Sequence, residues 1–540
     1  MALALGLLAP ADPRAIAALD HAGNRLDGHA TVTTRRVDAA LVGLDVGTTG
    51  ARAVAINRTG TFLATATQEY PLATPRPGWT EQDPETWWLA SMAALRKVTS
   101  ELAVPVLGVG LAGQMHGCVF LDKADRVIRP ALLWNDQRTA RQCAAITERV
   151  GEERLLSIAG NPALTGFQAP KILWLRDEEP KAYASIRRVL LPKDYVRLRL
   201  TGERATDASD ASGTLLLDLH ARDWSDEILD LLEIPREWLP RVHEGPDTTG
   251  SVTAAAAAST GLQAGIPVAA GGGDNAAAAV GNGIVNEGVI SSSIGTSGVI
   301  FADSATPRVD PQGRIHAFCH CVPGRYHLMG VTLAAGGSFR WWRDAGAGGI
   351  DYDTMASLAA QAPPGSEGLV FLPYIAGERT PHLDPYARGA FVGLQLRHTS
   401  AHLLRAVMEG VVYSLKDCLD LVTQLGVPVS EIRATGGASR SRMWRQLQAD
   451  VFGLPIHRNQ IDEGPAFGAA LLGGIAAGVY ADVDQASSHI RFDPEVTAPD
   501  LERHRLYQRY HAVYSKLYVA TAAAMHELEK LSRPEGELGP

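Results

Sequence analysis

The sequence has few cysteines and no long run of apolar residues. Its 540 residues include five cysteines, an odd number scattered along the chain, which does not fit the disulfide framework of a small secreted protein. No stretch approaches the roughly 18 consecutive apolar residues that a membrane-spanning helix needs. The first residues, MALALGLLAP, have no basic region before their short apolar run, which argues against a signal peptide. We therefore expect a cytoplasmic protein without a membrane partner.

Positive charge is also scarce. The chain has 50 Lys and Arg against 59 Asp and Glu, which gives a net charge of −9 and an isoelectric point of about 6.0. Proteins that bind nucleic acids usually carry a basic patch, so we expect no nucleic-acid partner. The chain is longer than one hydrophobic core usually organises, and we expect two large domains.

Three familiar ligand motifs are missing or incomplete. No lysine follows a glycine, so the phosphate loop G-x-x-x-x-G-K-[ST] is absent. Residues 108–113 spell G-x-G-x-x-G after a strand, but the following QMHGCVFLD predicts a loop and a strand, whereas a dinucleotide site needs a helix there. The run CHC at residues 319–321 lacks a second pair of ligands nearby and is assigned to the core.

The hydrophobic pattern predicts an α/β protein. Residues 41–72 read as a strand meander, and a helix begins at Asp83-Pro84-Glu85, where a capping residue precedes a proline and an acid. A strand at 265–273 ends in glycines before a short helix. Further predicted helices lie at 353–361, 399–425, 440–452 and 500–531.

The two halves of the chain open in the same way. The turn GTTG at residues 47–50 recurs 248 residues later as GTSG at residues 295–298, and similar apolar runs flank both turns. We interpret this as a structural duplication. The predicted organisation is a loosely ordered extension over 1–40, a first domain over 41–286 and a second over 287–530.

The two glycine-threonine turns are candidate phosphate sites. Backbone N–H groups at such a turn converge on one point and favour an anion, and two facing turns could hold both ends of a polyphosphate. Asp45 precedes the first turn and is a candidate ligand for Mg²⁺, because this ion prefers oxygen ligands. The alternative is that Asp45 caps its own turn.

Asp274 is the strongest candidate for a catalytic group. It lies between a strand end rich in glycine and a helix start, where ligands commonly bind in α/β sheets. A carboxylate there could accept the proton of a hydroxyl group that attacks phosphorus. The alternative is a helix N-cap.

Three further segments suit a polyhydroxylated ligand or an adenine ring. GQMHG (113–117), in a strand-end loop, and WNDQR (134–138) offer polar side chains, although His116 could instead bond within its loop and WNDQR could be a capped helix start. The glycine pair in ATGGAS (434–439) leaves open backbone against which an adenine could lie, or it is a plain strand-to-helix connection.

Taken together, these segments resemble the FGGY carbohydrate kinase family. The resemblance covers about residues 41–525 and is carried by segments that occur in the same order, among them GLDVGTTGARAVAIN, GQMHG, LLWNDQR, AGGGDNAAAAVG, SIGTSGVIF, FLPYIAGERTPH and GGASRSRMWRQLQADVFG. GQMHG together with WND resembles the branch that acts on D-xylulose more than the branch that acts on glycerol. The resemblance implies two ribonuclease-H-like domains of the actin-type ATPase class with a deep interdomain cleft.

The resemblance also implies a reaction and a set of site residues. The reaction is phosphorylation of D-xylulose at its 5-hydroxyl by ATP with Mg²⁺, and relatives suggest a homodimer. Asp274 is the implied general base, and Asp45 with Asp274 the implied metal site. The other implied contacts are Met115, His116, Asp274 and Asn275 for the sugar, Thr48 and Thr49 near the transferred phosphoryl group, Gly295 and Thr296 near the ADP phosphates, and Gly436, Gly437, Ala438 and Ser338 around the nucleotide.

Other functions remain open on the sequence alone. A kinase for ribulose, L-xylulose or an alditol would carry the same motifs, because one hydroxyl group's stereochemistry separates these substrates. A sugar sensor that has lost catalysis is a further alternative, although Asp45, Asp274 and both turns are intact. An actin-like ATPase without an acceptor would leave GQMHG unexplained.

Overall fold

The structure is a computed structural model that describes residues 39–460 and 464–532. The extension predicted for residues 1–40 lies outside the described residues except for its last two positions. The described residues belong to one compact unit.

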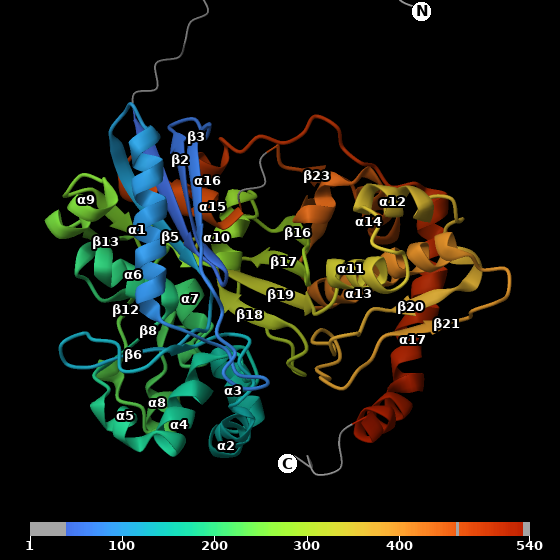
Figure 1. Cartoon of the computed structure of the whole chain (residues 1–540), viewed down its shortest axis with the longest axis horizontal. Coiled ribbons are helices and arrows are strands. Elements are labelled where there is room, and N and C mark those ends of the chain that lie inside the picture. Colours follow the sequence, from blue (N-terminus) through green and yellow to red (C-terminus); the bar gives the residue numbers. More distant parts are fainter. Residues whose placement is uncertain (1–38, 461–463, 533–540) are drawn as a thin grey trace, which may run out of the picture. The chain divides into compact units, whose positions relative to one another are not determined.

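The first sheet begins with the predicted antiparallel meander of β1 (Ala40–Val46), β2 (Gly50–Asn57) and β3 (Phe62–Glu69). Next to β1, on its other side, β5 (Val106–Gly113) runs parallel to it. The sheet continues beyond β5, with the remaining strands being β14 (Pro267–Ala269), β13 (Thr248–Ser251) and the short β15 (Gly272–Gly273). In Figure 1 helix α1 (Pro84–Glu101) lies along this sheet, and Asp83 caps it as the sequence predicts.

The second sheet repeats this plan and confirms the duplication. Its strand order is β18-β19-β17-β16-β22-β23, in which β16 takes the place of β1 and β22 the place of β5. The pairing of β1 with β5 shifts register between Ala40 and Leu41, and the pairing of β16 with β22 shifts between Gly288 and Val289. Those irregularities are also 248 residues apart. The strands are β16 (Gly288–Ile294), β17 (Gly298–Ser304), β18 (His316–Cys319), β19 (Tyr326–Thr332), β22 (Val429–Thr435) and β23 (Ile456–Arg458).

Helix α15 (Gly464–Ala476) is the main element that the sequence did not predict. It packs against β1 and β5 of the first sheet and beside α10 (Asp274–Gly281), although it follows the second sheet in the chain. Figure 1 shows it, in orange-red, among the blue strands. A Cβ atom on Gly110 would lie 1.7 Å from the backbone oxygen of Ala469, so glycine permits this close approach. The glycines of 108–113 therefore serve helix packing. The predicted boundary at residue 287 assigns α15 to the second domain, whereas the helix packs on the first sheet.

The remaining elements complete the layers around the two sheets. The helices predicted in the second half are confirmed as α12 (Tyr352–Ala359), α13 (Ser400–Gln424), α14 (Arg442–Phe452) and α17 (Leu501–Ser532). The other helices are α2 (Ala140–Val150), α3 (Glu152–Ala159), α4 (Gln168–Glu178), α5 (Pro180–Ser185), α6 (Pro192–Thr201), α7 (Ala208–Ser212), α8 (Asp226–Leu232), α9 (Ala254–Thr260), α11 (Gly336–Ala345) and α16 (Val483–Ser487). The minor strands are β4 (Glu81–Gln82), β6 (Val119–Leu121), β7 (Ala131–Leu132), β8 (Arg188–Leu190), β9 (Ala205–Asp207), β10 (Leu217–Asp218), β11 (Asp223–Trp224), β12 (Arg241–His243), β20 (Val370–Leu372) and β21 (Ala390–Val392).

The cysteines lie in the interior, as the sequence predicts for the CHC run. All five cysteines are buried and free, including Cys319 and Cys321, so the CHC run belongs to the core. Within the described residues no helix is both long enough and apolar enough to cross a membrane.

Candidate functional site

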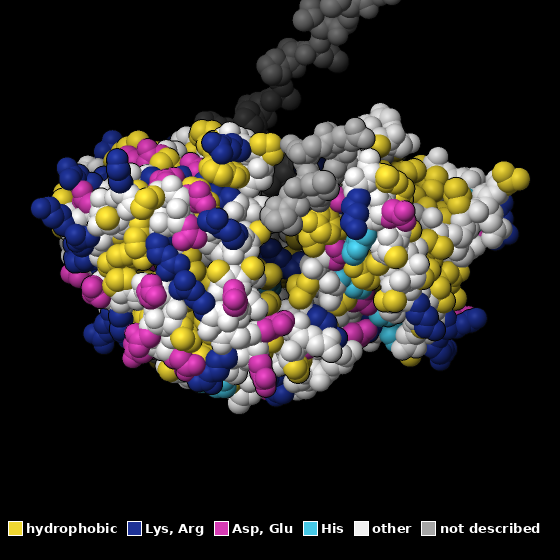
Figure 2. Space-filling view, turned by 90° about the horizontal axis from the view of Figure 1, so that it is seen from below, with side chains coloured by type: hydrophobic (Ala, Val, Ile, Leu, Met, Phe, Trp, Pro, Cys, Tyr) yellow, Lys and Arg dark blue, Asp and Glu magenta, His cyan; other side chains and the backbone are white. Residues whose placement is uncertain are grey.

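Three adjoining cavities lie near the two glycine-threonine turns, and residues of both turns line one of them. The His116 cavity, of about 320 Å³, has walls from both halves, including Thr48, Met115, His116, Asp274, Asn275, Ser293, Gly295, His316, Met329, Val331 and Arg379. The Asp45 cavity, also about 320 Å³, shares Asp274, Asn275 and Ser293 with it. The Trp444 cavity, about 580 Å³, lies within the second half and shares Gly295 with the His116 cavity. Figure 2 shows one face of the molecule hollowed near its middle.

Asp45 and Asp274 form a pair of carboxyl groups in the Asp45 cavity. Burial and, after it, the charge of Asp274 raise the pKa of Asp45 to about 7, while Arg52, its register partner on β2, opposes both. Burial likewise raises the pKa of Asp274 to about 6, against two hydrogen bonds from Asn275. Two neighbouring carboxyl groups with raised pKa values are costly to ionise, and a cation bound between them would offset that cost.

The alternatives considered for these two acids do not match the geometry. The Gly47 N–H closes the first turn by donating to the Gly50 carbonyl oxygen (3.0 Å), while Asp45 Oδ1 is buried without a hydrogen bond. Asp274 is the first residue of α10 and does not precede it as an N-cap; its Oδ1 accepts from the backbone N–H (2.7 Å) and Nδ2 (2.9 Å) of Asn275. Both carboxyl groups therefore keep capacity for a ligand.

Met115 and His116 are held in the wall by a strained turn. His116 has a φ of 67°, and the Gly117 N–H donates to the Met115 carbonyl oxygen (2.9 Å) across it, a tight turn that non-glycine residues rarely adopt. His116 Nδ1 donates to the Gly213 carbonyl oxygen (2.6 Å). This bond leaves Nε2 as a hydrogen-bond acceptor. Burial lowers the pKa of His116 to about 3, so the ring is neutral.

A buried charge cluster lies behind this wall. Lys193 Nζ lies 2.8 Å from Oδ1 of Asp207, and the other oxygen of this carboxylate, Oδ2, accepts from the backbone N–H of Ser209 (2.8 Å). The hydroxyl of Ser209 in turn accepts the backbone N–H of Gly273 (3.1 Å), directly before Asp274. The cluster therefore fixes the strand end that presents Asp274.

The two predicted phosphoryl contacts on the first turn differ in position. Thr48 lines the His116 cavity, where its hydroxyl accepts from Trp134 Nε1 (3.0 Å) and donates to Gln114 Oε1 (3.2 Å). Trp134, from the predicted WNDQR wall, lines the same cavity. Thr49 is exposed and does not line any of the three cavities, and its carbonyl oxygen accepts the Tyr70 N–H.

The predicted nucleotide contacts lie mostly around the Trp444 cavity. Its wall includes Gly295, Thr296, Gly437 and Ala438, with Trp444, Phe339 and Tyr352 as aromatic surfaces. Gly436 lines the Asp45 cavity, and its φ of 75° together with the closeness of the Ile294 carbonyl oxygen accounts for glycine there.

Ser338 lies differently from the prediction. Its side chain is buried, and its hydroxyl donates to the carbonyl oxygen of Ala334 (2.5 Å), one turn earlier. The neighbouring Gly336, and not Ser338, lines the Trp444 cavity.

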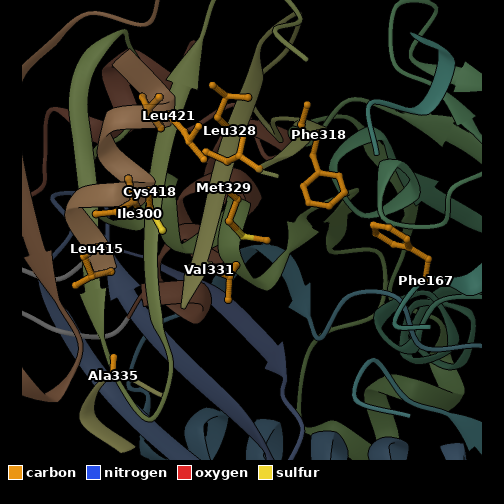
Figure 3. Close-up of a cluster of buried hydrophobic side chains, with 14 of the residues drawn as sticks. Phe167, Ile300, Phe318, Leu328, Met329, Val331, Ala335, Leu415, Cys418 and Leu421 are labelled. Carbon is orange, nitrogen blue, oxygen red and sulfur yellow. The ribbon is translucent and has the colours of Figure 1, made fainter. Parts of the chain in front are cut away.

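Sequence reasoning missed the wall that the second half contributes to the His116 cavity. His316 of this wall packs edge-on against Phe167 of the first half, which directly precedes α4 (ring centroids 5.9 Å apart), and Phe167 in turn packs edge-on against His116 (5.0 Å). Figure 3 shows Phe167 beside Phe318, with Met329 and Val331 on the neighbouring strand. Arg379 completes this wall. Its segment, GERTPH, was noted only as part of a resemblance.

Both halves of the chain match known proteins. Residues 40–281 match the N-terminal domain, and residues 290–477 the C-terminal domain, of the FGGY family of carbohydrate kinases. The chain is 41% identical to a xylulose kinase of Escherichia coli (strain K12), over 88% of this chain and 98% of that protein. A solved xylulose kinase from Rhodospirillum rubrum superposes with a TM-score of 0.84 at 32% identity, covering 90% of this chain and all of that one. A gluconate kinase from Lactobacillus acidophilus gives a TM-score of 0.85 at 27% identity, covering 91% and 99%.

Proposed function

Because the chain belongs to the FGGY family of carbohydrate kinases, we propose that it transfers the γ-phosphoryl group of ATP to the 5-hydroxyl of D-xylulose. The observation that carries this proposal is the position of Asp274, which lines both the cavity with the predicted sugar contacts and the cavity with Asp45. The similarity to xylulose kinases over most of the chain supports D-xylulose as the acceptor.

In this mechanism Asp274 removes the proton from the attacking hydroxyl. With a pKa of about 6 the carboxyl group is mostly ionised at neutral pH, yet basic enough to take the proton as the new O–P bond forms and the bond to ADP breaks. Asn275 orients the carboxylate through its two hydrogen bonds. The walls from both halves surround the acceptor and limit the access of water.

The donor set of the Asp45 cavity fits a magnesium ion. Asp45 Oδ1 is buried without a hydrogen-bond partner, and Asp274 faces the same cavity, so Asp45 and Asp274 would hold the ion, directly or through water. A bound magnesium ion supplies positive charge that neutralises the phosphoryl oxygens. The turns at residues 47–50 and 295–298 then hold the phosphate chain with backbone N–H groups.

The test of the function is a coupled assay of ADP release with pentuloses, hexuloses, alditols and gluconate as acceptors. We expect D-xylulose to give the highest kcat/KM and the product to carry phosphate on O5. A higher kcat/KM for any other acceptor would reassign the substrate, and ADP release independent of every sugar would contradict the kinase proposal.

Two further proposals concern the setting of the enzyme. We place it in the cytoplasm, where ATP is available and where five free thiols remain reduced. We also propose a homodimer, which light scattering of the purified chain tests directly.

A further inference from the structure

The chemistry of a 2-ketopentose sets a requirement on the His116 cavity. This step rests on the proposed function. A 2-pentulose closes its stable ring only by adding O5 to the C2 carbonyl, because O4 would give a four-membered ring. A sugar whose O5 attacks phosphorus is therefore bound as an open chain with a free ketone. Its C1–C2 end presents one carbonyl acceptor and one hydroxyl donor, and the cavity must satisfy both.

Arg379 brings an unpaired cation to this cavity. The residues on either side of Arg379 are tied to the end of β19, since Thr380 N–H donates to the Val331 carbonyl oxygen (2.9 Å) and the side-chain Oε1 of Glu378 accepts from Leu333 N–H (3.0 Å). Within the described part of the chain, the guanidinium group forms no recorded hydrogen bond or ion pair, and it is half-buried in the cavity wall. Removing a cation even partly from water without giving it a partner is costly, so this group is suited to a ligand.

His316 brings an acceptor of fixed orientation to the same wall. The amide nitrogen of Asn161 donates to the carbonyl oxygens of Ala317 (2.7 Å) and Ala159 (3.2 Å), which turns its amide oxygen toward His316 Nδ1 (2.8 Å). That oxygen only accepts, so Nδ1 carries the proton and Nε2 keeps its lone pair. Burial holds the pKa of His316 well below its ordinary value, so the ring stays neutral.

Arg379 lies at the histidine end of the cavity. His316 faces Met329 across β18 and β19, and Val331, two residues further along β19, is bonded to Thr380. The positive charge of Arg379 contributes to lowering the pKa of both His116 and His316, after burial and, for His116, after the charge of Lys171. The pKa of Asp274, in contrast, is set by burial and by Asn275.

We propose that Arg379 and His316 bind the hydroxyketone end of the open-chain sugar and make the enzyme selective for ketoses over alditols. Arg379 donates to the C2 carbonyl oxygen, and His316 Nε2 accepts from the C1 hydroxyl. The opposite end of the five-carbon chain then reaches Asp274 with O5.

The experiment compares D-xylulose with xylitol and D-arabinitol, the two alditols formed by reducing its ketone. In Arg379→Gln we expect KM for D-xylulose to rise and the ketose-to-alditol ratio of kcat/KM to fall by about 10- to 100-fold, because a shorter, neutral amide replaces the charged donor to the carbonyl. KM for ATP and turnover with the alditols should change little. Arg379→Lys keeps a cationic donor and should recover part of the ratio. Arg388→Gln, in the same loop but outside the cavity wall, is the matched control.

Other outcomes overturn the proposal. An equal loss of kcat with ketose and alditols would mean that Arg379 acts on the phosphoryl group or on the fold. An unchanged ketose-to-alditol ratio of kcat/KM would mean that Arg379 does not recognise the ketone. If Arg379→Gln does not fold, His316→Asn tests the proposal in its place. Asparagine keeps a hydrogen-bond donor to Asn161 and removes the acceptor that Nε2 provides. This variant should lose the same selectivity, whereas His316→Gln should retain more of it. Failure of the wild-type chain to use D-xylulose would instead contradict the proposed function.

Discussion

At the residue scale, the pKa values of Asp45 and Asp274 connect stability with metal binding. Both values lie well above that of an exposed aspartate, and burial is the main cause in each case. Between about pH 4 and pH 7 the folded protein therefore binds more protons at these groups than the unfolded chain does. Stability contributed by these groups falls as the pH rises through that window.

This direction of the pH dependence of stability gives a test that does not depend on activity. In chelator, Asp45→Asn should gain stability over the wild type as the pH rises from 5 to 8, by on the order of 2–4 kcal/mol, because the amide avoids ionisation. Thermal unfolding at several pH values measures the difference. Added Mg²⁺ should stabilise the wild type at pH 8 more than the variant. A pH-independent difference would contradict the raised pKa of Asp45.

Ser293 takes the place of Asp45 in the second half and allows a second test. It faces both the Asp45 and the His116 cavity, beside the turn predicted to hold the ADP phosphates. Ser293→Asp puts a negative charge there and should weaken ADP binding by roughly tenfold or more through repulsion. Calorimetric titration with ADP measures this, and Ser293→Asn is the uncharged control. Unchanged ADP affinity would count against two turns acting on one phosphate chain.

At the element scale, helix α15 depends on glycines in the strands beneath it. A Cβ atom on Gly43 would lie 1.8 Å from the Ala466 carbonyl oxygen, and one on Gly110 would lie 1.7 Å from that of Ala469. Backbone atoms cannot yield as a flexible side chain can. The helix also borders Asp274, because it packs beside α10.

Gly110→Ala should therefore be strongly destabilising. We expect a loss of about 3 kcal/mol or more in the free energy of unfolding, at the upper end of overpacking effects, because strand and helix must separate. Gly464→Ala, on helix α15 itself, is the control, since a Cβ atom at Gly464 would meet only the Cβ of Ala278 at 3.5 Å. Denaturant unfolding of both variants measures the difference, and equal stability would refute this packing.

At the scale of the whole molecule, the sequence predicts what local patterns determine. The meanders, the cap at Asp83 and the duplicated turns all depend on short-range signals, and the structure has them where expected. Helix α15 was missed because GPAFGAALLGGIA is apolar on every side, as a helix between a sheet and α10 must be, and so it lacks an amphipathic period.

The cavity wall from the second half was missed for a different reason. His316 and Arg379 are 200 or more residues from His116, and only the folding of β18, β19 and the following loop brings them to it. A single residue outside any local sequence motif gives no signal that it will line the same cavity as a distant residue. Ser338 shows the converse, because this polar residue in a glycine-rich segment donates its hydroxyl to the backbone of Ala334, just before its own helix.

The role of Asp274 is the central claim, and turnover of Asp274→Asn measured together with substrate binding tests it most directly. The amide has nearly the same shape but cannot accept the proton. We predict that the variant folds, binds D-xylulose and ATP, and loses about 10²- to 10⁴-fold in kcat. Near-normal kcat in this variant, with O5-phosphorylated product, would contradict Asp274 as the general base.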